Sequence, residues 1–262
     1  DRGKQNTLNN IGVVYMETGR LDEAMHYFME GLEYEEMVGD KCGMAGTLDN
    51  IGNLIHTKGD AEKALAYHQR SLDLYRMVGD RNGMAWCLSS LGYTYPDLGQ
   101  AEKGVKCFLE SSDICRDIGD QHILVYNCYG LADLNADLGK LDRAEGYVND
   151  ALALSKELGA KREEGAATYV LGKVLRERGK YQEAMAAFEA AREILGEVGD
   201  TYLGSLIDYD AGLCLKASGD PAGARELLTR ARIYFERGGM GLWLKRSDEA
   251  LADLDQQRLA SM

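Results

Sequence analysis

The chain has 262 residues, 45% of them apolar, with 31 glycines, only 2 prolines and a formal net charge of −13. Its 30 Lys and Arg residues against 43 acidic ones disfavour nucleic-acid and membrane partners, because binding phosphate-rich surfaces needs clustered cations. No apolar stretch approaches the roughly 20 residues of a spanning helix and no leader marks the chain for export, so we expect a cytoplasmic protein.

Glycine divides the sequence at a fixed interval of 40 residues. One series, followed by Asp except at its fourth member, consists of Gly39, Gly79, Gly119, Gly159 and Gly199. The other consists of Gly19, Gly59, Gly99, Gly139, Gly179 and Gly219. Together they cut each repeat into two segments of nearly equal length. Such a period is typical of architectures in which each unit packs only on its neighbours.

Both segments of every repeat are predicted to be helices. Leu8, Ile11 and Tyr15 show the i, i+3, i+7 spacing of an amphipathic helix, and the spacing recurs 40 residues later from Leu48 and Ile51. The glycine after each helix suits a left-handed C-cap, and an Asp that follows it suits the N-cap of the next helix. The expected unit is therefore a helical hairpin repeated six times.

A glycine also stands in the middle of most first helices, beginning with Gly12 and Gly52. Glycine in a helix interior costs about 1 kcal/mol relative to alanine, so we expect a compensating close approach of the second helix. Small residues hold the facing positions of the second helices, namely Ala24, Ala64, Gly104, Ala144, Ala184 and Ala224. This predicts a hairpin whose backbones pack closely along a seam of small residues.

The combined pattern resembles the tetratricopeptide repeat (TPR). The first repeat carries it in Leu8, Ile11, Gly12, Tyr15, Ala24, Phe28 and Gly31, and equivalents recur over residues 4–238. The resemblance implies an all-α fold, a right-handed superhelical solenoid of six TPR-like helical hairpins plus a C-terminal capping helix. The unit exceeds the common one of about 34 residues, so the chain is similar to Partner-of-Inscuteable-like adaptors and microbial signalling TPR proteins. HEAT and armadillo repeats share a period near 40 but lack this pattern.

Six repeats and a cap account for the chain in this interpretation. Within residues 1–240 the repeats span about 1–39, 40–79, 80–119, 120–159, 160–199 and 200–239, and residues 241–262 form the capping helix and tail. Leu251 and Ala252 continue the first-helix pattern. Asp248 and Asp255 make the opposite face polar, as the end of a solenoid requires.

No catalytic, nucleotide-binding or metal-binding motif is evident, so we expect neither an enzyme nor a cofactor nor a metal site. His68 occupies the slot that Phe28 holds in the first repeat, and we expect it at the edge of the core. The cysteines contain no C-x-x-C pair and fall on apolar helix faces, which favours reduced core thiols over disulfides or metal ligands. They are Cys42, Cys87, Cys107, Cys115, Cys128 and Cys214.

In the TPR family the first helices line the concave side, and carrying that stripe over gives a candidate peptide-binding groove. Its members here are Asn10, Asn50, Asn53, Trp86, Tyr93, Tyr126, Tyr129, Asp133, Tyr169, Lys173, Arg176, Tyr209 and Lys216. Asparagine amides can bind a peptide backbone, and large rings can anchor an interface. The acidic members should favour a basic ligand segment, and the basic members further along the chain an acidic one. Solvated polar residues and rings packed on the adjacent repeat are the structural alternatives.

The leading hypothesis is a non-enzymatic protein–protein interaction scaffold that binds a partner peptide or segment in this groove. The alternative is a regulatory or sensor TPR module excised from a larger signalling protein of the nucleotide-switch ATPase or cyclase type. Its partner would then be another domain of the same full-length chain. A start at Asp1 rather than Met, and the lack of a capping segment before the first repeat, are the features that favour this alternative.

Overall fold

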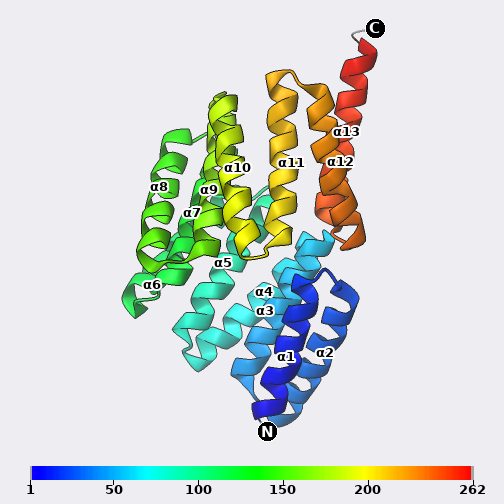
Figure 1. The fold of residues 1–262 in the computed structure, drawn as a ribbon. Helices are drawn as coiled ribbons and strands as arrows, with labels where there is room; N and C mark the ends of the chain where they lie inside the picture. Colours follow the sequence, from blue (N-terminus) through cyan, green and yellow to red (C-terminus); the bar gives the residue numbers. More distant parts are fainter. Residues whose placement is uncertain (1, 261–262) are drawn as a thin grey trace. The chain divides into compact units, whose positions relative to one another are not determined.

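The computed structural model describes residues 2–260, and these form thirteen helices and no strand (Figure 1). The helices are α1 (Arg2–Glu17), α2 (Leu21–Val38), α3 (Lys41–Lys58), α4 (Ala61–Val78), α5 (Arg81–Asp97), α6 (Ala101–Ile118), α7 (Gln121–Asp137), α8 (Leu141–Leu158), α9 (Lys161–Glu177), α10 (Tyr181–Glu197), α11 (Thr201–Ser218), α12 (Pro221–Arg237) and α13 (Gly241–Ala260). Consecutive helices pair as hairpins, with extensive contact between α1 and α2, α3 and α4, α5 and α6, and α9 and α10. The predicted all-α fold of helical hairpins with a terminal helix is confirmed. None of the described helices is long and apolar enough to cross a membrane.

The chain forms two compact units. Unit 1 comprises the residues up to Asn127 together with Arg237–Leu242, and unit 2 comprises Cys128–Glu236 together with the residues from Trp243 onward. Helix α7 gives its first part to unit 1 and its second part to unit 2. Each unit has buried apolar clusters of its own.

Glycine caps end the second helices as the sequence predicted. Gly39 terminates α2 in the left-handed conformation with φ of 72°, and within the described residues only glycines have positive φ. Asp40 follows immediately, and its carboxylate accepts hydrogen bonds from the N–H groups of Cys42 and Gly43 at the start of α3. Because C-cap and N-cap are adjacent residues, one helix ends and the next begins with no intervening loop.

The mid-helix glycines make room for a ring from the second helix. A Cβ added to Gly12 would lie 2.5 Å from the Phe28 ring, and one added to Gly172 would lie 2.5 Å from the Phe188 ring. The Phe28 ring is thus the nearest neighbour of Gly12, and Ala24, which the sequence predicted to face this glycine, is fully buried on the same helix as Phe28. The glycine therefore permits burial of a whole ring, which contributes roughly 2 to 3 kcal/mol.

Helix α13 closes the apolar face of the last hairpin in unit 2. Ala250 and Leu254 of α13 are buried against Ala224 and Leu228 of α12. Exposed polar residues make up much of the rest of α13, and Asp248 of α13 pairs with Arg232 of α12. An amphipathic helix of this kind covers the final hydrophobic surface of a repeat array.

None of the six cysteines, all within the described residues, forms a disulfide, and they differ in burial. Cys87, Cys115, Cys128 and Cys214 are buried, as expected for core thiols, whereas Cys42 is exposed. The prediction was wrong for Cys42 because it stands in the first turn of α3, before that helix enters the interface.

Candidate binding face on the first helices

The first helices of neighbouring repeats contact one another, α1 with α3 and α3 with α5 in unit 1, and α9 with α11 in unit 2. Polar side chains meet across these contacts at a separation of 41 residues. The pairs are Asn9 with Asn50, Asp49 with Ser90, His56 with Asp97, and Tyr169 with Asp210. We call the surface that these helices present the first-helix face. Its polar residues are arranged as a ladder between repeats.

Asparagines occupy the first-helix face on α1 and α3. Asn10 is exposed, and Asn50 and Asn53 are half-buried. The Asn50 amide donates a hydrogen bond to the Asn9 side-chain oxygen at 2.9 Å. An amide group offers two N–H donors and a carbonyl acceptor, so this one bond leaves Asn50 with capacity to bind a peptide group. The pairing also fixes the orientation of the Asn50 amide.

An aromatic cluster lies next along unit 1 and consists of Trp86 and Tyr93 from α5 and Tyr126 from α7. The Tyr126 ring centroid lies 5.5 Å from that of Trp86 and 5.4 Å from that of Tyr93. Tyr93 is in turn held edge-on by Phe108 of α6 at 4.9 Å. Trp86 remains 42% exposed. The cluster is therefore a rigid aromatic surface supported from behind and open at Trp86.

The predicted groove residues of α7 and α9 in unit 2 are more enclosed. Tyr129 and Tyr169 are buried, and the Tyr169 hydroxyl donates to Asp210 at 2.5 Å. Lys173, also buried, is ion-paired with Asp133. At Tyr129 and Tyr169 the burial fits the structural alternative, rings packed within the repeat array, better than an open groove.

Charges in this part of unit 2 neutralise one another across repeats. Arg176 forms an ion pair with Asp210. Burial alone would raise the pKa of Asp210, but the positive charges of Arg176 and Lys173 outweigh this effect. The pKa of Asp210 therefore lies below its usual value. For Lys173, burial would lower the pKa, but Asp133 and Asp210 outweigh it and raise the pKa. The predicted separation into an acidic and a basic end was therefore wrong, because the cations already have carboxylate partners.

Asp137 stands at the edge of this network. Its side chain keeps contact with solvent. Desolvation by the surrounding helices, and then repulsion from Asp133, raise the pKa of Asp137 to about 6. This carboxylate is the least stabilised charge in the network.

The last two predicted groove residues are engaged by the terminal helix. The Tyr209 ring centroid lies 5.6 Å from that of Trp243 on α13, and Lys216 donates to Asp253 of α13 at 3.0 Å. Sequence reasoning missed Trp243 and Asp253 because α13 forms only half a repeat. Tyr209 and Lys216 therefore belong to the contact between α11 and the terminal helix α13.

Sequence models place the chain in a known family. One model described as tetratricopeptide repeat matches residues 43–117 and 124–197, and a second with the same description matches residues 5–41. The chain belongs to the tetratricopeptide repeat family. No curated protein matches this TPR chain. Its similarity to Partner-of-Inscuteable-like adaptors stays a prediction.

Solved structures share the fold of this TPR chain at low sequence identity. A Rap protein complexed with competence and sporulation factor is 17% identical with a TM-score of 0.71, covering 95% of this chain and 75% of that one. The Rap conjugation gene regulator of plasmid pLS20, in complex with the Phr peptide, is 15% identical with a TM-score of 0.69, covering 98% and 85%. A signal transduction ATPase with numerous domains and a TPR sensor, from Pyrococcus horikoshii, is 15% identical with a TM-score of 0.64, covering 98% and 39%.

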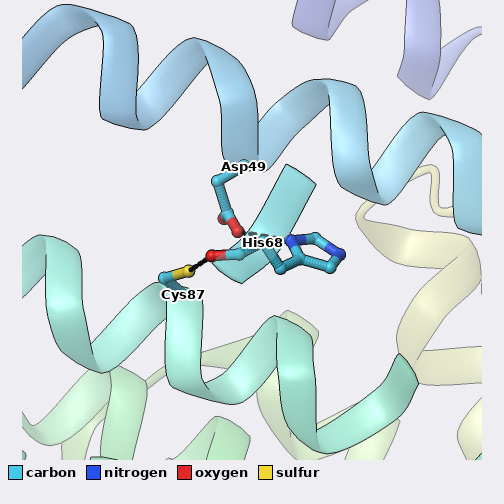
Figure 2. A group of neighbouring side chains, drawn as sticks. All are labelled: Asp49, His68 and Cys87. Atoms are coloured by element: carbon cyan, nitrogen blue, oxygen red, sulfur yellow. Dashed lines mark hydrogen bonds and ion pairs between the residues drawn. The ribbon is translucent and has the colours of Figure 1, made fainter. Parts of the chain in front are cut away.

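A second polar cluster in unit 1 of the TPR chain was not anticipated from the sequence. It joins Asp49 of α3, His68 of α4 and Cys87 of α5, all of them buried (Figure 2). The sequence feature that could have indicated this cluster is His68, which occupies the position where the first, third and fifth repeats have phenylalanine. The structure places its ring fully inside the protein, deeper than the expected core edge.

Proposed function

We propose that this TPR protein binds an extended peptide, or an extended segment of a partner protein, on the first-helix face of unit 1 without catalysing a reaction. The observation that carries the proposal is the supported aromatic cluster with Trp86 partly exposed to solvent, on the helix that follows the asparagine-bearing α1 and α3 in the series of first helices. Exposed tryptophans on a rigid support are frequent anchors of protein interfaces. The peptide-bound Rap structures with the same fold add support.

The two groups of residues have different roles in this proposal. Asn10, Asn50 and Asn53 hydrogen-bond to the peptide backbone and accept many sequences, because every residue carries the same peptide group. Trp86 selects one side chain, either apolar or cationic, by stacking. The net charge of −13 favours a basic peptide over an acidic one, mainly through faster association.

Peptide selection on the intact chain tests this function. Peptides are selected from a displayed library on the immobilised protein, and the Kd of a selected peptide is measured by calorimetry. Trp86→Ala is expected to weaken binding roughly 30-fold, the effect of losing about 2 kcal/mol at an anchor residue. Leu109→Ala on α6 is the matched control, since Leu109 is a large apolar residue of similar exposure (39% against 42%) on a second helix.

Two outcomes would reject the assignment. One is a selected peptide that binds Trp86→Ala and Asn53→Ala as tightly as the unchanged protein. The other is a larger loss for Leu109→Ala than for Trp86→Ala. Far-UV circular dichroism of each variant shows whether the helices are retained, so that a loss of binding is attributable to the face.

A second candidate function is a sensor module within a larger signalling protein. It is favoured by the likeness to the TPR sensor-containing ATPase, in which 98% of this chain is matched but only 39% of the other. Here the peptide or protein ligand would act on another domain of the same full-length chain. The sequence of the full-length gene tests this second function. A nucleotide-switch ATPase or cyclase segment in the same gene would support the sensor role, and a gene that encodes only repeats would contradict it. In either case six cysteines without a disulfide among them favour a reducing, cytoplasmic location.

A further inference from the structure

Three consecutive helices of unit 1 bring a carboxylate, an imidazole and a thiol to one buried point. Asp49 comes from α3, His68 from α4 and Cys87 from α5 (Figure 2). One ligand atom from each lies within 4.8 Å of the other two. These residue types are the common protein ligands of divalent transition metals.

The cluster departs from the pattern of the repeat. In the first repeat, Phe28 fills the slot of His68, and a Cβ on Gly12 would strike its ring. In the second repeat the imidazole of His68 packs on Gly52 in the same way, at 2.5 Å from an added Cβ. A polar ring in a fully buried apolar slot costs free energy unless its nitrogens are bonded. Phe28 needs no role beyond packing to explain its position, whereas His68 at the same repeat position does.

The hydrogen bonds of the cluster leave part of this cost uncompensated. His68 Nδ1 lies 2.8 Å from an Asp49 oxygen, and the second Asp49 oxygen accepts from Ser90 at 3.1 Å. The Cys87 thiol donates to the backbone carbonyl of His68 at 3.1 Å. His68 Nε2 is buried and has no hydrogen-bond partner among the described residues. A fully buried histidine with one unpartnered nitrogen is uncommon in a purely structural network.

We propose that Asp49, His68 and Cys87 bind one divalent transition-metal ion, with zinc as the best fit to this ligand set. Zinc bonds of about 2.0 to 2.3 Å hold ligand atoms roughly 3 to 4 Å apart, so these atoms, which lie within 4.8 Å of one another, would draw together by about 1 Å on binding. On binding, the Cys87 thiol loses its proton to solvent and its sulfur bonds the ion in place of the His68 carbonyl. A water or the nearby Ser90 hydroxyl completes four-coordination.

The ion would tie α3, α4 and α5 together and so stabilise the junction between the second and third repeats. These helices also carry Asn50, Asn53 and Trp86 of the first-helix face, but the metal site does not depend on that face binding a peptide. Because the ligands come from three helices, they meet only in the folded protein. Metal binding should therefore stabilise the native state.

Cobalt(II) is the probe that tests the site. The protein is stripped with a chelator, titrated with Co²⁺ and followed by absorption, where a thiolate ligand gives a charge-transfer band. We expect a band that saturates at one equivalent, disappears in Cys87→Ser and persists in Cys115→Ser, a matched buried thiol of unit 1 outside the cluster. No band in the unchanged protein, or an equal band in Cys87→Ser, would overturn the proposal.

His68→Phe gives a second, independent measurement, because it restores the ring found in the first, third and fifth repeats and should fold. Zn²⁺ is expected to raise the Tm of the stripped protein in a concentration-dependent way and to leave the Tm of His68→Phe unchanged. An equal rise in both proteins would show that zinc binds elsewhere and would contradict the assignment.

Discussion

Gly172→Ala tests the packing rule on which the hairpins depend. The new Cβ would lie 2.5 Å from Cε1 of Phe188, which is 1% exposed, so the ring would have to move by roughly 1 Å to reach ordinary contact. Overpacking of this kind costs roughly 1 to 3 kcal/mol, while alanine regains about 1 kcal/mol of helix propensity. We therefore expect a net destabilisation of about 0 to 2 kcal/mol.

Gly146→Ala in α8 is the matched control, because that glycine is helical, lies in the same unit and has nothing within 4 Å of an added Cβ. It should stabilise by up to about 1 kcal/mol. Equilibrium urea unfolding followed by circular dichroism gives the midpoints, compared at equal m-values. Phe188→Leu should relieve the clash, so the double variant with Gly172→Ala loses less than the sum of the single losses. Additive effects, or a Gly172→Ala protein as stable as Gly146→Ala, would refute the reasoning.

Three further changes address the charges and caps. Lys173→Met leaves Asp133 without its partner and should cost roughly 3 kcal/mol in urea unfolding, most of it recovered when Asp133→Leu is added. Asp137 has a folded pKa of about 6 against an unfolded value of about 3.9. The folded state therefore holds the Asp137 proton more tightly than the unfolded state, and the free energy of unfolding falls as pH rises from about 3.9 to about 6. Asp137→Asn should remove this pH dependence, which a series of urea unfolding midpoints at different pH values would show. Asp40→Ala removes the acceptor of two N–H groups and should lower stability by about 1 kcal/mol, whereas Asp40→Asn should not.

Local features were predictable because each acts within one repeat. Gly39 and Asp40 identify a helix end and a helix start from residue type alone, since few other residues adopt positive φ or cap an N-terminus as well. Gly12 was correctly placed at a close contact, but its nearest neighbour, the Phe28 ring, was not predicted. A facing small residue and a facing ring both explain a glycine, and only three-dimensional packing distinguishes them.

The binding face was harder to predict because its chemistry depends on contacts between repeats. Aligning the repeats at 40 residues identifies which side chains share a face. It does not show that a side chain at position i touches the one at i+41, as the Tyr169–Asp210 hydrogen bond does. Nor does it show the ion pairs, which form at other separations: Lys173 pairs with Asp133, 40 residues earlier, and Arg176 with Asp210, 34 residues later. Without these contacts, Lys173 and Arg176 look like a basic surface.

The ladder of i, i+41 contacts bears on the proposal that unit 1 binds the ligand. Where complementary groups meet, as Tyr169 and Asp210 do, each satisfies the other and the pair contributes to packing. Where similar groups meet, as Asn9 and Asn50 do, one hydrogen bond forms and donor and acceptor capacity remains. The same holds for Trp86 and Tyr126, whose ring contact leaves Trp86 partly exposed. In this repeat array, binding capacity should therefore lie where neighbouring repeats present like side chains.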